Sequence, residues 1–435
     1  MNNFTAMDTI VSDVMIQFVL LENWSRGCNI SQTGLTDFNI VCFIKGNSNL
    51  KFADFRNLTS RLSSNIKLDL FVNCDNGQIR FPWPFRADKL NRIYIKNCII
   101  KDYLTEFKNS LIDSIPDTIK YLQIENVTII YNVRELYDSL SKANSSLTKA
   151  AECGPENAYS IIQRRTRDIF EDIHNASHFT DFFNVLTDHS HYFSIQKRTC
   201  MYNNLEVFEL SGMKNLEKSS IDKIVYTDIA DNLKILNFSG NGIYYSLHKL
   251  QGWRLRFPRM EYLDFSDNNI KSLPFIRDYG RGIKGIKSVG IIDVRRNKIT
   301  ALTKAMIDSF STYKFVKADI SENPFLCDCG IIEAMEYLSS KTMPKAYDYL
   351  GSLECANPIH VRGRQLLSLS RADLNCTRKK ETIINVSILA ISIVAIIVSI
   401  VTFFAIYFRI LIKKIVYTRL NIKCPCQFKN GINDI

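Results

Sequence analysis

Two cysteines one residue apart raise the first question about chemistry. Cys327 and Cys329 lie in the stretch ENPFLCDCGIIEAMEYL. A disulfide needs Cα atoms about 4.4–6.8 Å apart with facing Cβ vectors, so thiols this close rarely bond each other. Each is therefore expected to reach a partner elsewhere, either another cysteine or, as the alternative, a zinc ion. Ten of the 12 cysteines precede residue 380, an even number that suits a disulfide framework.

Histidines form a second cluster of candidate ligands. His174, His178, His189 and His191 are four of the 6 in the chain, and the first two have i,i+4 spacing. A helical zinc-protease motif needs glutamate directly after the first histidine, but Asn175 stands there. Metal binding, pH sensing and a solvated surface helix stay open, and the last is the simplest interpretation.

Motifs of other catalytic chemistries are absent from the sequence. It contains no G-x-S-x-G, H-E-x-x-H, P-loop or G-x-G-x-x-G pattern. The chain is therefore predicted not to be an enzyme, and no cofactor or metal is expected. The net charge of +11 is spread along the chain, so we expect no nucleic-acid partner.

An apolar segment near the C-terminus indicates a membrane protein. Residues 383–408, IINVSILAISIVAIIVSIVTFFAIYF, carry no charge, and about 20 apolar residues suffice to cross a bilayer. Lysine and arginine are more frequent after this segment than before it, which favours a cytoplasmic C-terminal side. The predicted location is the plasma membrane, or an endosomal membrane, as a single-pass type I protein with an extracellular N-terminus.

Glycosylation sequons agree with that orientation, because all ten precede or touch the apolar segment and none follows it. In the predicted cytoplasmic tail, Cys424 and Cys426 are candidate palmitoylation sites. The predicted glycosylation sites are Asn23, Asn29, Asn57, Asn126, Asn144, Asn175, Asn237 and Asn375.

The N-terminus departs from the pattern of a signal peptide. The stretch MNNFTAMDTIVSDVMIQFVLLENW has no basic start, and Asp13 and Gln17 interrupt its apolar part. Either residues 14–21 act as a poor signal or the N-terminus is incomplete, and the second is the preferred expectation.

A repeated pattern supplies the elements that must position these residues. LKILNFSGNGI, MEYLDFSDNNI, VGIIDVRRNKI and FVKADISENPF share apolar residues at positions 1, 6 and 11, an apolar residue or alanine at 4, and asparagine at 9. Positions 4 and 6 lie on one side of a short strand, toward a core. The asparagines can bond backbone groups that a bend after the strand leaves unpaired. They are Asn241, Asn268, Asn297 and Asn323.

This pattern resembles the leucine-rich repeat, whose period is about 20–29 residues. The resemblance implies an α/β solenoid, the leucine-rich repeat horseshoe, with position 5 on its concave face. Asp264, Asp293 and Asp319 are then candidate contact residues on that face, and the alternative is that they are merely solvated. Asn237 occupies the same position, where a glycan would block part of the face.

Copies nearer the N-terminus are weaker. LNRIYIKNCII, IKYLQIENVTI and LEVFELSGM fit with another residue at position 9, and IKLDLFVNCD contains a further candidate with Asn73. Residues 137–204 are interpreted as an insertion or as decayed repeats. Apolar spacing within residues 159–173 slightly favours a helix and hence an insertion, which Cys153 and Cys200 bracket and could staple.

Cys327 and Cys329 follow the last repeat, in a pattern that resembles the C-terminal cysteine cap of extracellular leucine-rich repeat proteins. That resemblance implies disulfides Cys327–Cys355 and Cys329–Cys376. The last repeat of a solenoid exposes its apolar interior, and a lid too small for its own core needs such bridges. The stretch GIIEAMEYLSSK has apolar residues at three-residue spacing and predicts the lid helix.

Four further cysteines lie in the N-terminal part. Cys28 and Cys42 are expected in an N-terminal cap, and Cys74 and Cys98, 24 residues apart, between neighbouring repeats. The predicted organisation is an N-terminal segment over 1–45, degenerate repeats over 46–136, the insertion or decayed repeats over 137–204, repeats over 205–322, the cap over 323–376, a stalk over 377–382, a transmembrane helix over 383–408 and a tail over 409–435.

Repeats, cap and apolar segment together resemble a type I leucine-rich repeat receptor, and within that class a Toll-like receptor ectodomain. The 27 residues after the apolar segment are too few for the signalling domain that such receptors carry. The predicted function is therefore a recognition, accessory or decoy receptor, in innate immune recognition or signal transduction. It would bind an extracellular protein or microbial ligand, as a homodimer or with a signalling co-receptor, and the alternative is cell adhesion.

Overall fold

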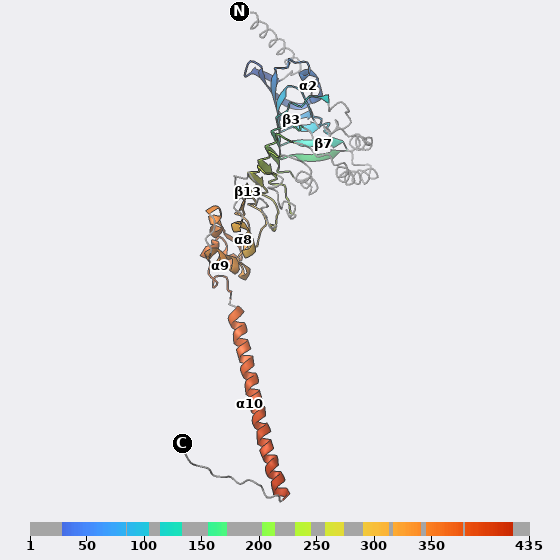
Figure 1. Cartoon of the computed structure of the whole chain (residues 1–435). Coiled ribbons are helices and arrows are strands. Elements are labelled where there is room, and N and C mark those ends of the chain that lie inside the picture. Colours follow the sequence, from blue (N-terminus) through green and yellow to red (C-terminus); the bar gives the residue numbers. More distant parts are fainter. Residues whose placement is uncertain are drawn as a thin grey trace, which may run out of the picture. The chain divides into compact units, whose positions relative to one another are not determined.

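The structure is a computed structural model of the chain. It describes residues 28–83, 85–103, 114–132, 155–171, 202–213, 231–244, 257–273, 290–312, 316–340, 345–376 and 379–420. The chain divides into two compact units, Met1–Leu369 and Ser370–Ile435. The first unit holds the strands, and the second holds the long helix α10 (Lys379–Arg419) (Figure 1).

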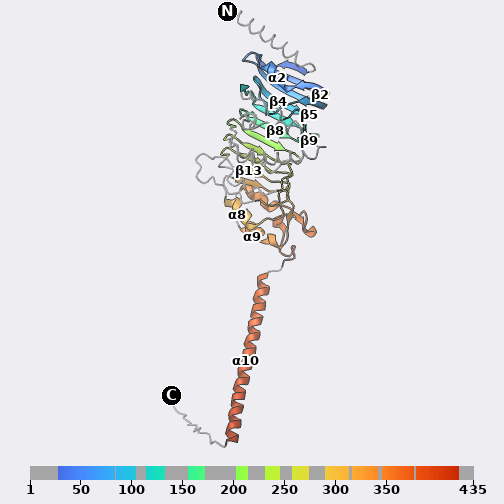
Figure 2. The same cartoon turned by 90° about the vertical axis from the view of Figure 1, so that its right-hand side faces the viewer.

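One sheet organises the first unit, and its neighbouring strands are parallel except for the β1–β2 pair. Along the series β2, β3, β4, β6, β8 and β10 to β14, each repeat adds one strand beside the last (Figure 2). The strands are β1 (Cys28–Gln32), β2 (Asp37–Lys51), β3 (Lys67–Arg80), β4 (Leu90–Lys96), β5 (Ile99–Lys101), β6 (Tyr121–Glu125), β7 (Thr128–Asn132), β8 (Ser160–Arg164), β9 (Arg167–Glu171), β10 (Val207–Ser211), β11 (Ile235–Asn237), β12 (Tyr262–Asp264), β13 (Gly290–Asp293) and β14 (Val316–Asp319).

Positions 4 and 6 of the repeats build the core, as the sequence pattern predicts. Leu236 and Phe238 from one repeat lie beside Leu263 and Phe265 from the next, and all four are fully buried. The rings of Phe238 and Phe265 are in contact, with centroids 5.6 Å apart. Burial of each such side chain contributes about 1.5–3 kcal/mol, so this stack of inward residues is the main source of stability.

Strands β4, β6, β8 and β10 to β14 each end at a corner where one residue adopts a left-handed backbone conformation. That residue is always at position 8, one before the asparagine position. Its amide donates to the carbonyl of position 7 in the next repeat, as Arg165 donates to Ser211 at 2.8 Å and Gly240 donates to Ser266 at 3.0 Å. The left-handed corner residues are Asn97, Asn126, Arg165, Gly212, Gly240, Asp267, Arg296 and Glu322.

After the corner, the last four repeats use their asparagines to satisfy the backbone. Nδ2 of Asn268 donates to the carbonyls of Phe238 and Phe265, both at 3.0 Å. Its Oδ1 accepts from the amides of Asn241 and Ile243, both at 3.0 Å. One buried side chain thus ties two turns of backbone together. Corresponding bonds are made by Asn241, Asn297 and Asn323.

The N-terminal repeats satisfy the same backbone in another way. Position 9 is Cys98, Val127 or Thr166, none of which has a side-chain amide. Here the chain continues past the corner as a second run of parallel strands, β5, β7 and β9, which branches from the distal half of β3. Cys98 also forms a disulfide with Cys74 of the previous repeat, which confirms the expected bridge, and Cys28 bonds to Cys42.

Two sequence interpretations are wrong. Within the stretch whose apolar spacing favours a helix, residues 160–164 and 167–171 form strands β8 and β9, because β8 pairs with β6 and β10 and β9 pairs with β7. It is a diverged repeat in phase with its neighbours. Asn73 of β3 pairs in register with Lys96 of β4. It therefore lies before the corner and not at position 9, where the repeat asparagines stand.

The cap begins directly after β14. A disulfide joins Cys327 to Cys355, and the apolar side of the lid helix α9 is buried through Ile332, Met335 and Leu338, as predicted. The remaining elements of the first unit are α2 (Phe52–Thr59), α8 (Lys304–Thr312), β15 (Phe325–Leu326), η4 (Cys329–Ile331), α9 (Ile332–Ser340), η5 (Lys345–Ser352), β16 (Cys355–Asn357), η6 (Ile359–Val361) and η7 (Leu366–Ser368).

Helix α10 contains a stretch, Ser387–Val416, of 30 residues with mean hydropathy 2.9. By length and composition it is the one helix in the described part of the chain that could cross a membrane. Its serine and threonine hydroxyls donate back to carbonyls one turn earlier, as Ser399 does to Ala395 at 2.9 Å. These bonds satisfy the hydroxyl donors within the helix, which lowers the cost of placing them in an apolar surrounding.

We predict that Asn268→Ala lowers the free energy of unfolding by about 3 kcal/mol, because the buried amides of Asn241 and Ile243 lose their acceptor and two buried carbonyls each lose one of their donors. Urea unfolding of the full chain in lipid nanodiscs measures the change. Asn269→Ala is the matched control, since the side chain of Asn269 is exposed and donates one long bond, 3.5 Å, to the carbonyl of Gly242. Equal losses in the two variants would contradict the ladder's role.

Candidate ligand-binding face and cap pocket

The open face of the sheet consists of the side chains at positions 3, 5 and 7 of the strands. The register aligns these positions from β2 to β14, so they form three columns across the repeats. Positions 4 and 6 fill the core behind them. The open face is therefore a continuous surface across the repeats.

Aromatic side chains gather at the N-terminal end of the open face. We call Phe43, Phe71, Tyr94 and Tyr121 the aromatic strip; they come from β2, β3, β4 and β6. Phe43 is 63% exposed and Tyr121 is 39% exposed. The rings of Phe71 and Tyr94 meet edge to face at 6.4 Å, and Tyr121 stacks on Tyr159 at 6.2 Å. Sequence reasoning missed this strip, although aligning the weak repeats would have brought the aromatic residues together.

Charges on the same part of the face are paired across neighbouring strands. Nε of Arg164 donates to Glu209 at 2.6 Å and its Nη2 donates at 2.7 Å, a two-point contact. The hydroxyl of Tyr94 donates to Glu125 at 2.9 Å. Arg92 lies 5.0 Å from the ring centroid of Tyr121. These contacts fix the rings that they border.

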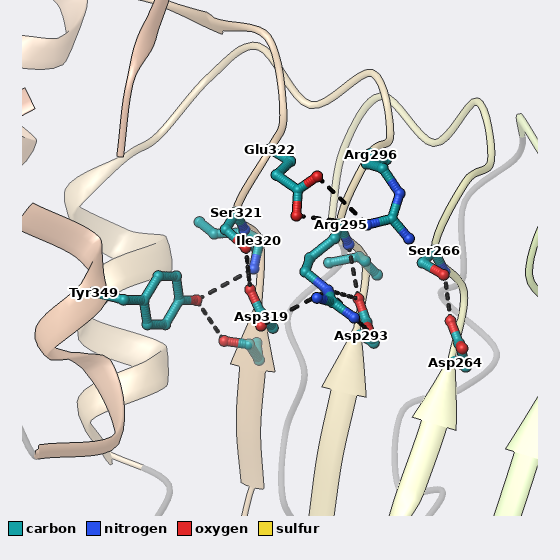
Figure 3. Close-up of polar contacts among 12 residues, drawn as sticks. Asp264, Ser266, Asp293, Arg295, Arg296, Asp319, Ile320, Ser321, Glu322 and Tyr349 are labelled. Carbon is teal, nitrogen blue, oxygen red and sulfur yellow. Dashed lines mark hydrogen bonds and ion pairs between the residues drawn. The ribbon is translucent and has the colours of Figure 1, made fainter. Parts of the chain in front are cut away.

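The acidic column predicted at position 5 has a structural role in each repeat. Asp264, Asp293 and Asp319 lie side by side in register. Each Oδ1 accepts a hydrogen bond from the amide two residues later, at 2.8–3.1 Å, and so closes the turn after the strand (Figure 3). Asn237 does the same in the previous repeat, at 2.8 Å. The first two carboxylates are buried, so the column is not a solvated acidic surface.

Asp293 carries its charge because partners surround it. Burial would raise the pKa of Asp293, but hydrogen bonds from Arg295 and Tyr262 outweigh it, and the pKa is lowered. Nη2 of Arg295 and the hydroxyl of Tyr262 both donate to Oδ2, each at 2.6 Å. Asp264 lacks such a cation, and burial raises the pKa of its carboxyl. The pKa values of these two neighbouring aspartates are therefore shifted in opposite directions.

Tyrosines of the cap close the free edge of the sheet. The hydroxyl of Tyr349 donates to the carbonyl of Ala318 at 2.5 Å and accepts from the amide of Ile320 at 3.2 Å (Figure 3). The hydroxyl of Tyr347 accepts from the amide of Ala318 at 3.2 Å. Burial raises the pKa of Tyr347 to about 12, so this hydroxyl stays neutral. Side chains thus replace the strand that would otherwise follow β14.

A cavity of about 960 Å³ opens beside this edge, and we call it the cap pocket. It is bordered by the turn after β13, by β14 with its turn, and by cap residues from Tyr349 to Gly363. Among the residues that line it are Arg296, Lys298, Lys317, Asp319, Glu322, Tyr349, Glu354 and Arg362.

The other predicted site residues divide into two groups. Cys329 and Cys376 are each disulfide-bonded, and with Cys327 bonded to Cys355 the zinc interpretation of the C-x-C pair is wrong. Asn29, Asn57, Asn126 and Asn375 are exposed, and Asn237 is half-buried. Outside the described residues lie Asn23, Asn144, Asn175, Cys153, Cys200, Cys424, Cys426 and the four clustered histidines.

Nothing in the described ranges forms a group of three metal-ligating side chains. The buried carboxylates of the open face close turns or pair with arginine, rather than converge on a cavity. The arrangement offers a rigid surface with exposed rings and one lined pocket. This is chemistry suited to binding.

No protein-family model matches the chain. Trophoblast glycoprotein of Macaca fascicularis is 28% identical over 121 residues, which is 28% of this chain and 27% of that protein. Toll-like receptor 2 type-2 of Gallus gallus is 26% identical over 164 residues, 38% of this chain and 19% of the receptor. Toll-like receptor 2 of Homo sapiens is 24% identical over 211 residues, 42% of this chain and 26% of the receptor.

The chain resembles leucine-rich repeat receptors of the Toll-like type. The matches to these three relatives span 19–27% of their own lengths. The crystal structure of human trophoblast glycoprotein aligns with 80% of this chain at 13% identity and a TM-score of 0.37. The sequence matches and the parallel strands agree on a likeness to leucine-rich repeat proteins.

Because the pKa values of Asp264 and Asp293 shift in opposite directions, replacing each by asparagine should change stability in opposite directions. The raised pKa of Asp264 means that stability is lost as the pH rises through that pKa, so Asp264→Asn should be more stable than wild type at pH 7. Asn237 shows that asparagine keeps the turn bond. The lowered pKa of Asp293 means that stability is present above the unfolded value and lost in acid, so Asp293→Asn should be less stable at pH 7.

Thermal unfolding of both variants between pH 3 and pH 8 checks the pair. The difference in unfolding temperature between each variant and wild type should shrink toward acidic pH, where the wild-type carboxyls become protonated. The same sign of effect for both variants at pH 7 would contradict the assignment.

Proposed function

We propose that this chain is a membrane-anchored leucine-rich repeat recognition receptor that binds a protein partner through its aromatic strip. The observation that carries the proposal is the exposure of Phe43 and Tyr121 on a face whose backbone is rigidly held. Aromatic residues and arginine are enriched at the centres of protein interfaces. Arg92 lies among these rings.

The proposed topology places the repeats outside the cell and α10 across the membrane. Its support is the apolar stretch in α10 and the excess of lysine and arginine on its C-terminal side. The sequons at Asn29, Asn57 and Asn126 then lie on exposed residues of the extracellular part and are proposed as glycosylated. Palmitoylation of Cys424 and Cys426 is proposed on the cytoplasmic side.

The Toll-like resemblance supports a role in innate immune recognition, with a microbial or host protein as ligand. Signal transduction is proposed to depend on assembly, either of two copies of this chain or with a co-receptor that bears a signalling domain. Trophoblast glycoprotein matches with similar identity, so the resemblance does not by itself separate reception from adhesion. Adhesion is therefore the competing outcome of the test.

We predict that Phe43→Ala, Phe71→Ala and Tyr121→Ala together weaken partner binding at least about tenfold, because truncating interface aromatics commonly costs more than 1 kcal/mol each. Cross-linking of the full chain on intact cells, followed by quantitative mass spectrometry, measures which surface proteins depend on the strip. The control truncates three exposed apolar residues outside the open face, Leu35, Tyr244 and Ile359.

Three possible results distinguish a receptor from an adhesion protein and from a chain that does not bind through this face. Loss of specific partners in the strip variant alone supports reception. Aggregation of non-adherent cells that express the chain, abolished by the strip variant, supports adhesion. Identical cross-linked proteins in wild type, strip variant and control would contradict binding by this face.

A further inference from the structure

The cap pocket has walls that are held in place before any ligand arrives. Tyr349 is fixed by its two bonds to the backbone of Ala318 in β14 and of Ile320 just after it. Asn323 is buried, and its Nδ2 donates to the carbonyls of Val294 and Ile320 at 2.9 and 2.8 Å. Cys355 is tethered by its disulfide to Cys327. A preformed cavity spares a ligand the entropic cost of ordering it.

Charges in the pocket fall into two sets. Two carboxylates are already engaged: Glu322 pairs with Arg296 at 3.4 Å, and Asp319 accepts from the hydroxyl of Ser321 at 2.7 Å. Arg295 adds a further contact to Asp319 at 3.9 Å (Figure 3). Arg296 thus offsets the charge of Glu322, and the carboxylate of Asp319 is held within its own turn.

Three cations in the pocket form the second set. Lys298, Lys317 and Arg362 make no ion pair with any carboxylate in the part of the chain that the structure describes. Nε of Arg362 donates to the carbonyl of Ala356 at 3.0 Å, which holds the guanidinium by one edge and leaves its terminal nitrogens. Nζ of Lys317 lies 5.8 Å from the ring centroid of Tyr349. Against these three stands one further lining carboxylate, Glu354.

We propose that the cap pocket binds an acidic peptide segment of a protein partner. Lys298, Lys317 and Arg362 would hold its carboxylates, with Arg362 suited to a two-point contact. The ring of Tyr349 and the side chain of Pro324 give the pocket an apolar wall for a neighbouring side chain of the peptide. That wall favours a peptide over a sulfated glycan, which presents few apolar groups. This inference rests on the proposed recognition function but uses a different surface from the aromatic strip.

A random octapeptide library displayed on phage, selected on the full chain in lipid nanodiscs, tests the proposal. Selected peptides are then labelled with fluorescein and titrated by fluorescence anisotropy. The pocket variant is Lys298→Gln, Lys317→Gln, Arg362→Gln. The control variant, Lys45→Gln, Lys67→Gln, Lys271→Gln, removes the same charge from exposed residues away from the pocket.

The expected result is enrichment of peptides with aspartate or glutamate beside an apolar residue. Their Kd should rise at least about tenfold in the pocket variant and less than about twofold in the control. Arg362→Lys should lose part of the affinity, because it keeps the charge but not the planar fork. Thermal unfolding of each variant confirms that it is folded.

Other outcomes overturn the proposal. No enriched peptide, or peptides that bind the pocket variant as tightly as wild type, would refute the site. A heparin octasaccharide that binds wild type but not the pocket variant, while acidic peptides do not bind, would reassign it to a sulfated glycan. Peptides lost in the aromatic-strip variant but kept in the pocket variant would refute the pocket and leave the proposed function standing.

Discussion

Backbone groups at the corner after each strand are the constraint on which the rest of the structure depends. A left-handed residue at position 8 turns the chain away from the sheet, and the amides and carbonyls beyond it are buried. Buried groups of this kind must be paired, because an unpaired one costs about 1–3 kcal/mol. The chain meets this requirement in two ways, and the change between them divides the repeats.

The two solutions leave the open face continuous. In the C-terminal repeats one asparagine side chain serves two turns. In the N-terminal repeats the backbone pairs with itself as β5, β7 and β9. Corner amides follow one rule in both parts, so the register of positions 3, 5 and 7 passes from β8 to β10 without a shift. The ladder ends at Asn323, and there the cap tyrosines satisfy the edge strand.

Features with a single local cause could be predicted from the sequence. The four asparagine repeats, their buried positions 4 and 6, and the apolar side of α9 follow from side-chain chemistry at fixed spacing. For the diverged repeat at β8, the sequence left decayed repeats and an insertion open and slightly favoured the insertion, because Thr166 stands where the pattern expects asparagine. Its apolar residues also suit a helix, and only pairing with β6 and β10 decides between the two.

The candidate sites were harder to predict, because they depend on which repeats lie side by side. The aspartates at position 5 seemed available for contacts, yet Asp293 is 2% exposed and paired within its turn. Aromatic residues of the strip come from four strands whose sequences show no shared motif. The cap pocket joins Lys298 and Arg362, which are 64 positions apart in the chain, a proximity that only the folded cap creates.

One hydrogen-bonded register runs through the diverged repeat at β8 and joins the N-terminal repeats to the C-terminal repeats. Hydrogen–deuterium exchange of the full chain in nanodiscs tests it most directly, at the amides of β8 and of the corner residue Arg165. If the register is continuous, these amides exchange as slowly as those of β6 and β12. Exchange of residues 160–165 at the rate of an unstructured peptide, with β6 and β12 still protected, would contradict it.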